Sequence, residues 1–125
     1  MLRDEIIRIS EGKVVKSKFG RAKTVYEILP NQKGLSEYWI MPSSTVNWWN
    51  LSSTLIEQMK QEKVNFSLVF ISEKNDEVFY IDYDEVELFL QDISTCKDRG
   101  DYKVNRRDLV NPITIDSFIE FIVNL

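Results

Sequence analysis

The sequence predicts an α+β or α/β fold, a single domain over residues 1–125 with a central mixed β-sheet and about three helices packed on it. Residues 66–71 and 78–81 are apolar runs separated by a short polar turn, a pattern typical of a β-hairpin. Apolar residues at helical spacing follow the hairpin directly and recur in two other segments. The resulting order of elements, β-β-β-α-β-β-α-β-α, favours a mixed sheet with helices on its faces.

The N-terminal part of the chain predicts strands. Residues 3–10 are compatible with a short helix or a first strand, and their three isoleucines weakly favour the strand. Residues 13–30 predict two strands with a turn at or near Gly20, and Pro30 ends the second. A helix over residues 22–29 is the alternative.

The next part predicts a strand, an irregular segment and a helix. Residues 36–41 form the strand, which Pro42 stops, and the following SSTVNWWN is polar apart from its aromatic residues. A helix is expected over residues 51–63, capped by Asn50 or Ser52. Its apolar stripe consists of Leu51, Leu55, Ile56 and Met59.

The hairpin is the centre of the predicted sheet. Residues 66–71 are uncharged and apolar or small on both faces, as expected of a strand with neighbours on either side. After the second strand the period changes, which predicts a helix over about residues 84–93. Asp82 or Asp84 is in place to cap this helix.

The C-terminal part predicts a loop over residues 94–101, a short edge strand over residues 102–106 and a last helix capped by Thr114 or Asp116. Within this part, Arg106 and Arg107 either pair with the acidic part of the chain or contact a phosphate of a ligand.

The residue types present exclude several kinds of catalytic site. Histidine is absent and Cys96 is the single cysteine, so Ser/His/Asp and Cys/His nucleophilic sites are excluded, as is zinc bound by histidine or by a cysteine cluster. Carboxylates that bind magnesium or calcium, or a catalytic carboxylate pair, are the remaining routes. No catalytic residue, metal site or cofactor is therefore predicted.

The sequence contains no run of about 18 apolar residues, so we expect no membrane span. The first ten residues mix charges with apolar side chains and lack the apolar core of a signal peptide. A single cysteine forms no internal disulfide, which is consistent with a reducing compartment. We expect a cytoplasmic protein.

Charge is distributed unevenly along an acidic chain. The formal net charge is −4, but residues 1–33 carry eight basic against four acidic residues, and residues 34–101 carry five against thirteen. A hairpin with a basic tip can follow nucleic-acid phosphates, whereas lysines on a solvated hairpin also discourage edge pairing. The basic segment in question comprises Lys13, Lys16, Lys18, Arg21 and Lys23.

All three tryptophans, Trp39, Trp48 and Trp49, lie within eleven residues. Trp39 falls on a predicted strand and is expected in the core. Trp48 and Trp49 fall in the segment predicted to be irregular, where two adjacent rings are not easily both buried. Either this loop packs on the core, or the rings form a surface for a partner or for base stacking.

Four acidic residues, Asp82, Asp84, Glu85 and Glu87, precede or begin the helix predicted after the hairpin. Oxygen-rich clusters can bind calcium or magnesium, but the glycine turn of a calcium loop is missing here. Capping and a favourable interaction with the helix dipole explain these residues sufficiently.

Residues 38–90 resemble the second half of nucleases with the restriction-endonuclease-like PD-(D/E)XK fold. The resemblance rests on the succession YWIMP, NLSSTLIEQMKQ, FSLVFIS and VFYIDYDEVELFL, which matches a Tyr/Trp-rich strand, a helix, an apolar strand and a strand that leads into a helix. It implies a nuclease-like fold, with a catalytic strand at the preceding TVYEILP.

The catalytic motif of that family is incomplete here. The family has an acid, one further residue and then a lysine, but Leu29 stands two positions after Glu27 where the lysine is expected. Such a nuclease needs its carboxylates to hold magnesium and its lysine to orient or activate the attacking water. If the fold is present, the resemblance therefore implies that the site has been lost.

Two functions follow as hypotheses. The first is a small acidic, non-catalytic binding protein, such as an inhibitor, immunity or accessory protein, which engages another protein, in particular a basic or nucleic-acid-processing one. Its expected contact residues are Trp48, Trp49, Asp82, Asp84, Glu85 and Glu87. The alternative is a nuclease-fold or nucleic-acid-binding domain with a degenerate site, in which the basic segment follows the phosphates and Glu27 is a metal ligand.

Overall fold

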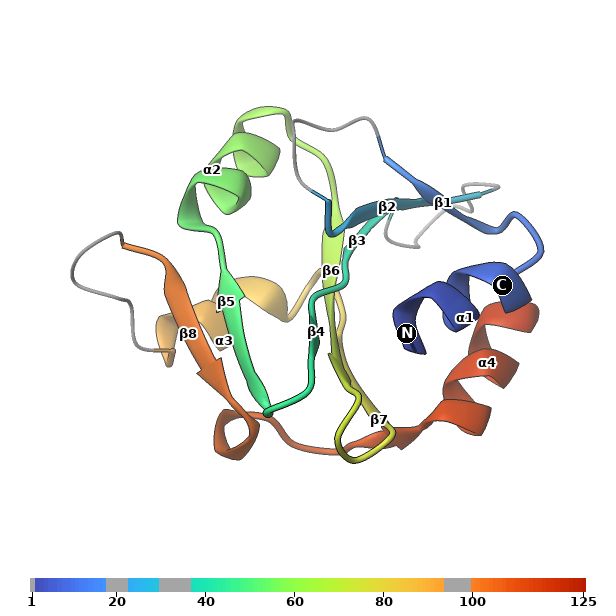
Figure 1. Ribbon diagram of the computed structural model, residues 1–125. Coiled ribbons are helices and arrows are strands. Elements are labelled where there is room, and N and C mark those ends of the chain that lie inside the picture. Colours follow the sequence, from blue (N-terminus) through green and yellow to red (C-terminus); the bar gives the residue numbers. More distant parts are fainter. Residues whose placement is uncertain (1, 18–22, 30–36, 94–99) are drawn as a thin grey trace.

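A computed structural model describes residues 2–17, 23–29, 37–93 and 100–125 of the chain (Figure 1). These residues form the expected α+β fold: a mixed sheet of seven strands, a separate ribbon of two strands, and four α-helices. The strands are β1 (Val14–Lys16), β2 (Val25–Ile28), β3 (Tyr38–Ile40), β4 (Ser43–Ser44), β5 (Trp48–Leu51), β6 (Phe66–Ser72), β7 (Glu77–Ile81), β8 (Tyr102–Asn105) and β9 (Ile113–Thr114). The helices are α1 (Leu2–Ile9), α2 (Ser53–Gln61), α3 (Val86–Gln91) and α4 (Ile115–Val123), with a 3₁₀ helix η1 (Arg106–Asp108).

The main sheet has the strand order β1-β2-β3-β6-β7-β9, and β4 pairs with the far end of β6. The two pairs β3–β6 and β4–β6 are parallel, and the other neighbours are antiparallel. A parallel pair needs a crossover, which the chain makes through β5 and α2 between β3 and β6. From β2 to α3 the chain forms β2, β3, β4, β5, α2, β6, β7 and α3, so β4 and β5 are additional to the succession that the nuclease resemblance implies.

Strand β6 is the centre of the sheet, as its sequence predicts. All seven of its residues are buried, because it has β3 and β4 on one edge, β7 on the other, and helices over both faces. The predicted hairpin with β7 is also confirmed, in a register that places Phe70 opposite Phe79.

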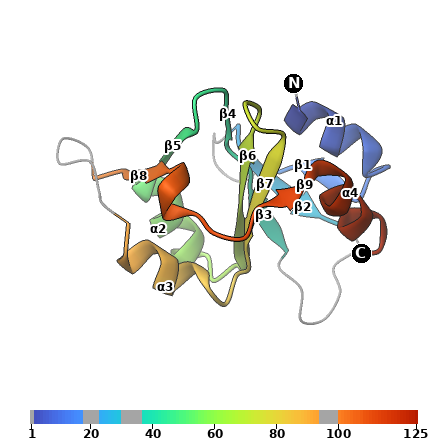
Figure 2. The same cartoon turned by 90° about the horizontal axis from the view of Figure 1, so that it is seen from below.

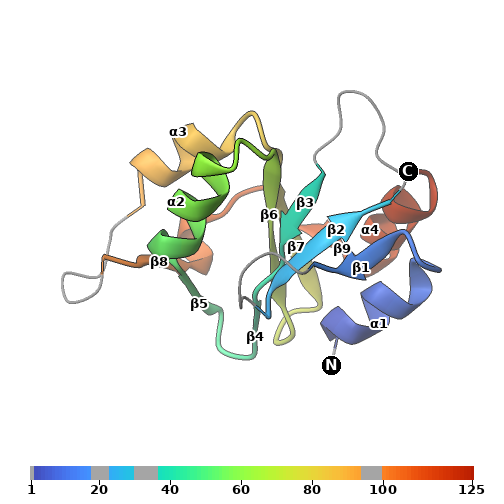
Figure 3. The same cartoon turned by 90° about the horizontal axis from the view of Figure 1, so that it is seen from above.

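Two apolar clusters cover the two faces of the sheet. One, built around Trp49, Phe70 and Met59, lies between the sheet and α2, α3 and the β5–β8 ribbon. The other, which includes Ile6 and Phe118, lies under α1 and α4. Figures 2 and 3 show these two groups of elements on opposite sides of the sheet.

Several expectations for the elements are wrong. Residues 3–9 belong to helix α1, so the helix interpretation of this segment is right and the weakly favoured strand is wrong. The segment SSTVNWWN is not irregular, since it contains β4 and most of β5. Residues 25–28 form β2, not the alternative helix. The turn expected at Gly20 and most of the loop expected over residues 94–101 lie outside the described residues.

The helix caps agree in part with expectation. Ser52 caps α2 and Thr114 caps α4, each by accepting a hydrogen bond from a backbone N–H of the first turn. Helix α3 begins at Val86 after Glu85 and has no side-chain cap, so the expectation of a cap from Asp82 or Asp84 is wrong. None of the described helices is long and apolar enough to cross a membrane.

Candidate functional site

The two adjacent tryptophans have different environments. They lie on β5, where successive side chains point to opposite faces, so Trp48 is 42% exposed and Trp49 is 2% exposed. The ring of Trp49 packs against Phe70 and Phe79 in the core. The expectation that both rings are available to a partner is therefore wrong for Trp49, because the segment is a strand and not a loop.

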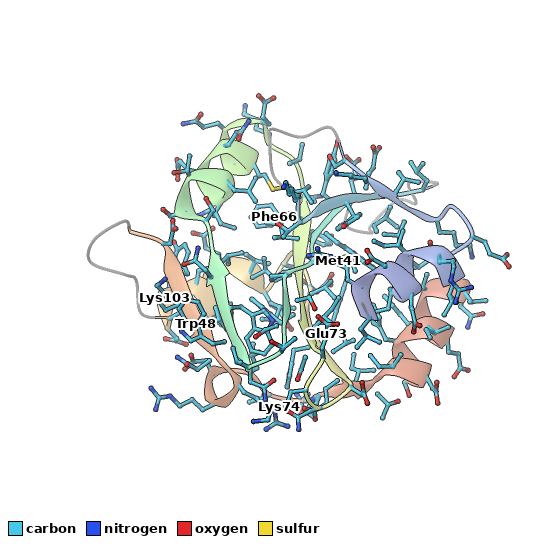
Figure 4. The ribbon with its side chains drawn as sticks, viewed as in Figure 1. Met41, Trp48, Phe66, Glu73, Lys74 and Lys103 are labelled. Carbon is cyan, nitrogen blue, oxygen red and sulfur yellow. The ribbon has the colours of Figure 1, made fainter. Side chains whose placement is uncertain are left out.

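Trp48 is part of a small polar surface on the β5–β8 ribbon. The Nζ atom of Lys103 lies 4.4 Å from the centre of the Trp48 ring, which is a cation–π contact (Figure 4). The same Nζ donates a hydrogen bond to Oδ1 of Asn50 at 2.8 Å. These contacts hold the exposed ring in place beside a positive charge.

The four acidic residues at the start of α3 do not act as one cluster. Asp82 is half-buried and accepts hydrogen bonds from the hydroxyl groups of Ser67 and Tyr80. Burial raises the pKa of Tyr80 to about 12, and the neighbouring charge of Asp82 adds to this shift, whereas the hydrogen bond to Ser67 lowers the pKa. Asp82 therefore has an internal structural partner.

The other three acidic residues, Asp84, Glu85 and Glu87, are exposed. Glu87 forms a salt bridge of 3.0 Å with Lys60 of α2. Figures 2 and 3 show helix α2 and strand β8 between α3 and β5. Of the six predicted contact residues, Trp49 is buried and Asp82 is half-buried with internal partners, so an acidic face with both tryptophans at its centre is not formed.

The basic segment is described in part. Lys13 donates hydrogen bonds to the carbonyl oxygens of Val123 and Leu125, at 2.5 and 3.4 Å. Lys16 ends β1 and Lys23 precedes β2, and both are exposed. Lys18 and Arg21 lie outside the described residues. Lys13 thus binds the C-terminal segment. That nucleic-acid phosphates follow the basic segment stays a prediction.

The position implied by the nuclease resemblance has acidic residues but no described metal site. Glu27 on β2 lies opposite Tyr38 on β3. Burial raises the pKa of Tyr38, and the charges of Glu27 and then Glu37 add to this shift. In the described part of the chain, no three acidic or sulfur side chains come close enough together to hold a metal ion.

Two concave regions of the described surface differ in chemistry. One, of about 380 Å³, lies between the ends of β2 and β3 and the start of α2, and none of the described residues that line it is charged. The other, of about 330 Å³, lies between α3, β7 and the segment that leads to β9. We call the second one the α3 groove. Its lining residues are Phe79, Tyr80, Ile81, Glu85, Leu88, Phe89, Asp92, Asp108, Leu109, Val110 and Asn111.

The α3 groove combines exposed apolar side chains with acidic ones. Leu88 on α3 is 68% exposed and Val110 on the facing segment is 75% exposed. Among the described residues, the charged ones that line the groove, Glu85, Asp92 and Asp108, are all acidic. The groove therefore suits a ligand with both apolar and basic groups.

The segment on the far side of the groove is fixed by local interactions. Asp108 accepts a hydrogen bond from the backbone N–H of Asn105, which closes the short helix η1. Arg106 forms a salt bridge with Glu77 of β7, with a shortest distance of 2.8 Å. Leu109 is then buried in the core, which leaves Val110 facing outward.

Of the residues that line the groove, Glu85 is among those predicted from the sequence, whereas the apolar residues are not. Leu88 is an apolar residue off the buried stripe of α3, and Val110 is an apolar residue in a loop. Each was a weak signal by itself. Their significance depends on their lying on opposite sides of one groove. Parts of the chain that are distant in the sequence form this groove.

No protein-family model matches the sequence, and no curated protein matches it. Among solved structures, the fold is similar to the Holliday junction resolvase Hjc of the archaeal hyperthermophile Archaeoglobus fulgidus, with a TM-score of 0.48 and 12% sequence identity. The similarity covers 90% of this chain and 95% of the resolvase chain. A likeness at this level does not bear on activity.

Proposed function

We propose that this chain is a non-catalytic binding domain that engages another protein through the α3 groove. One observation carries the proposal: two well-exposed apolar side chains, Leu88 and Val110, flank a groove whose charged lining residues, in the described part of the chain, are all acidic. Single exposed apolar residues are ordinary, but two of them beside a concave surface are typical of a contact site.

The physical gain from covering this groove is substantial. Removing a leucine or valine side chain from water stabilises a complex by about 1.5–3 kcal/mol before the entropy of association is subtracted. The carboxylates of Glu85, Asp92 and Asp108 add attraction for a basic partner and disfavour an acidic one. We infer that the partner offers an apolar segment with arginine or lysine residues.

The finer role of inhibitor, immunity or accessory protein is a proposal within this one. A nucleic-acid-processing protein has a basic surface, and an acidic groove with apolar edges is complementary to such a surface.

The experiment is a selection of short random peptides on the immobilised protein, followed by affinity measurements on the enriched peptides. We expect enrichment in arginine or lysine together with aliphatic residues. The variants Leu88→Asp and Val110→Asp should weaken binding of these peptides by about tenfold or more, which is about 1.4 kcal/mol each.

A matched control is available in Val46, which is 70% exposed and does not line the α3 groove. Val46→Asp introduces the same change of charge at an exposed valine elsewhere. Peptides whose affinity is equally unaffected by all three variants, or a selection that enriches nothing, would remove the proposal.

A second candidate is a nucleic-acid-binding domain, favoured by the exposed ring of Trp48 beside Lys103. An aromatic ring next to positive charge can stack with a base of a single strand. A labelled single-stranded oligonucleotide at low salt tests this candidate, with Trp48→Ala and Lys103→Ala as variants. Binding that both variants weaken, and that falls steeply with salt, supports it. The absence of any binding at low salt removes it.

A further inference from the structure

We infer that the partner segment binds as an extended strand, which adds to the outer edge of β7 at Tyr80 and continues the sheet where β9 stops. This inference rests on the proposed function, since it specifies how a protein partner occupies the α3 groove. It follows from the pairing of β7, the direction of its backbone groups and the conformation of the segment before β9.

The outer edge of β7 is covered along part of its length. On its inner edge, β7 pairs with β6 through all five residues, Glu77–Ile81. On its outer edge, β9 pairs with Glu77 and Val78 alone among the described residues. The remaining residues of β7, Phe79–Ile81, line the α3 groove.

The direction of the backbone groups follows from a neighbouring strand. The N–H group of Ile71 on β6 donates a hydrogen bond to the carbonyl oxygen of Pro42 at 2.9 Å, so the backbone N–H and C=O groups of Ile71 point away from β7. Its partner on β7, Val78, therefore belongs to a pair without mutual hydrogen bonds, and its own N–H and C=O groups point outward, toward β9. The direction of the backbone N–H and C=O groups alternates along a strand. Those of Phe79 therefore point toward β6, and those of Tyr80 point outward, away from β6.

Tyr80 thus offers one N–H and one C=O group at an edge that β9 does not reach. In the described part of the chain, no backbone–backbone hydrogen bond joins Tyr80 to the segment before β9. An added strand would bond to both of these groups.

The segment before β9 explains why the pairing stops. A continued ladder would place Pro112 opposite Phe79 and Asn111 opposite Tyr80. Proline lacks the N–H group that a ladder uses, and Asn111 has a φ of 58°, which is left-handed and not extended. The chain therefore leaves the edge of β7 at this point, and the α3 groove lies between the two.

The side chains around this edge specify an alternating segment. Residues of an added strand opposite Phe79 and Ile81 would face the α3 groove, where an arginine or lysine can lay its aliphatic part on apolar surface and place its charge near Asp92 or Asp108. Residues opposite Tyr80 would face the other side of the sheet, where the ring of Phe121 lies 5.5 Å from that of Tyr80. An apolar residue fits there.

A second copy of this chain is a poor occupant. A symmetric pairing of two β7 edges would bring the acidic residues of two α3 grooves together, and like charges at an interface disfavour association. A partner segment in which basic and apolar residues alternate has the complementary charge and the required period of two.

The test uses a short synthetic peptide in which arginine and valine alternate, with two matched controls. One control has the same composition with all arginines before all valines, so charge and apolar content are unchanged. The other keeps the alternating sequence but carries N-methyl groups on alternate backbone amides along one edge, made in both possible registers, so that the edge facing β7 cannot donate. Binding is measured by fluorescence anisotropy, and exchange of the Tyr80 amide proton by NMR.

We expect the alternating peptide to bind more tightly than both controls by roughly tenfold or more. We also expect it to slow exchange of the Tyr80 N–H by a similar factor, while the Phe79 N–H, already bonded to β6, changes little. Binding that depends on Leu88 but tolerates N-methylation in both registers would overturn strand addition and leave the proposed groove function intact. Failure of every peptide, including those from the random selection, would overturn both.

Discussion

The indole Nε1 of Trp49 donates a hydrogen bond to the carbonyl oxygen of Ile71 at 3.1 Å, in the buried interior. This bond joins the β5–β8 ribbon to the central strand β6 of the main sheet. Ile71 is free to accept it because its backbone faces the β4 side of β6. One of the two adjacent tryptophans thus has a structural role, and the other remains at the surface.

Replacing Trp49 by phenylalanine should destabilise the protein by about 2–4 kcal/mol, since it leaves the Ile71 carbonyl without this donor and leaves a cavity beside Phe70. Urea denaturation measures the change. Trp48→Phe is the matched control, because its ring is exposed, and we expect a change within about 0.5 kcal/mol. Equal effects at the two positions would contradict the structure.

Ser52→Ala should reduce stability by about 1 kcal/mol, because the Ser52 hydroxyl accepts the hydrogen bond from the backbone N–H of Leu55 at the start of α2. Thr54→Ala is the control within the same helix, at an exposed position. Thermal unfolding of the two variants decides the prediction, which requires the Ser52 variant to be clearly the less stable.

Ionisation of the Tyr80 hydroxyl should make the folded protein less stable at high pH. Its pKa is raised to about 12 in the folded state, above the value of about 10 for an exposed tyrosine. The unfolded chain therefore loses the proton first, and the stability contributed by the neutral hydroxyl is lost as the pH rises from about 10 toward 12. In Tyr80→Phe, the fall in stability over this range should be smaller. An identical pH dependence in both proteins would refute the assignment.

Glu73 should contribute to stability at neutral pH and lose this contribution in acid. Hydrogen bonds from the Ser43 hydroxyl and then from the backbone N–H of Leu2 lower the pKa of the Glu73 carboxyl. Its contribution is therefore present above about pH 4.3, the value for an exposed glutamate, and is lost as the pH falls through the lowered folded-state pKa. Glu73→Gln should be less stable at neutral pH and show a flatter stability profile between about pH 5 and pH 3. Glu62→Gln, at an exposed site, serves as the control.

The parts of the fold that follow from local pattern could be predicted from the sequence. The uncharged run of β6, the polar turn after it and the apolar stripes of α2 and α4 each depend on residues close together in the chain. For α1, the sequence allowed a short helix or a strand and weakly favoured the strand, because its three isoleucines also suit a strand, although the spacing of Leu2, Ile6 and Ile9 is helical.

The candidate site could not be predicted to the same extent. Strand β5 was not predicted, because it pairs with β8, about fifty positions away in the sequence. A strand with such a distant partner gives no hairpin pattern in the local sequence. The α3 groove depends in the same way on residues that are far apart in the sequence, since Leu88 and Val110 both line it. Asp82 and Glu85 were predicted as members of one contact set, but the structure shows that Asp82 has an internal partner while Glu85 lines the α3 groove.

The cluster under α1 and α4 has a consequence for how the chain is made. It joins Ile6, from the first helix, to Trp39 on β3 and to Phe118 and Ile122, from the last helix. During synthesis on the ribosome, Ile6 and Trp39 emerge long before α4 does, so this face of the sheet stays open until α4 has been synthesised. Nascent chains that stall before α4 should therefore expose the Trp39 ring and depend on chaperones.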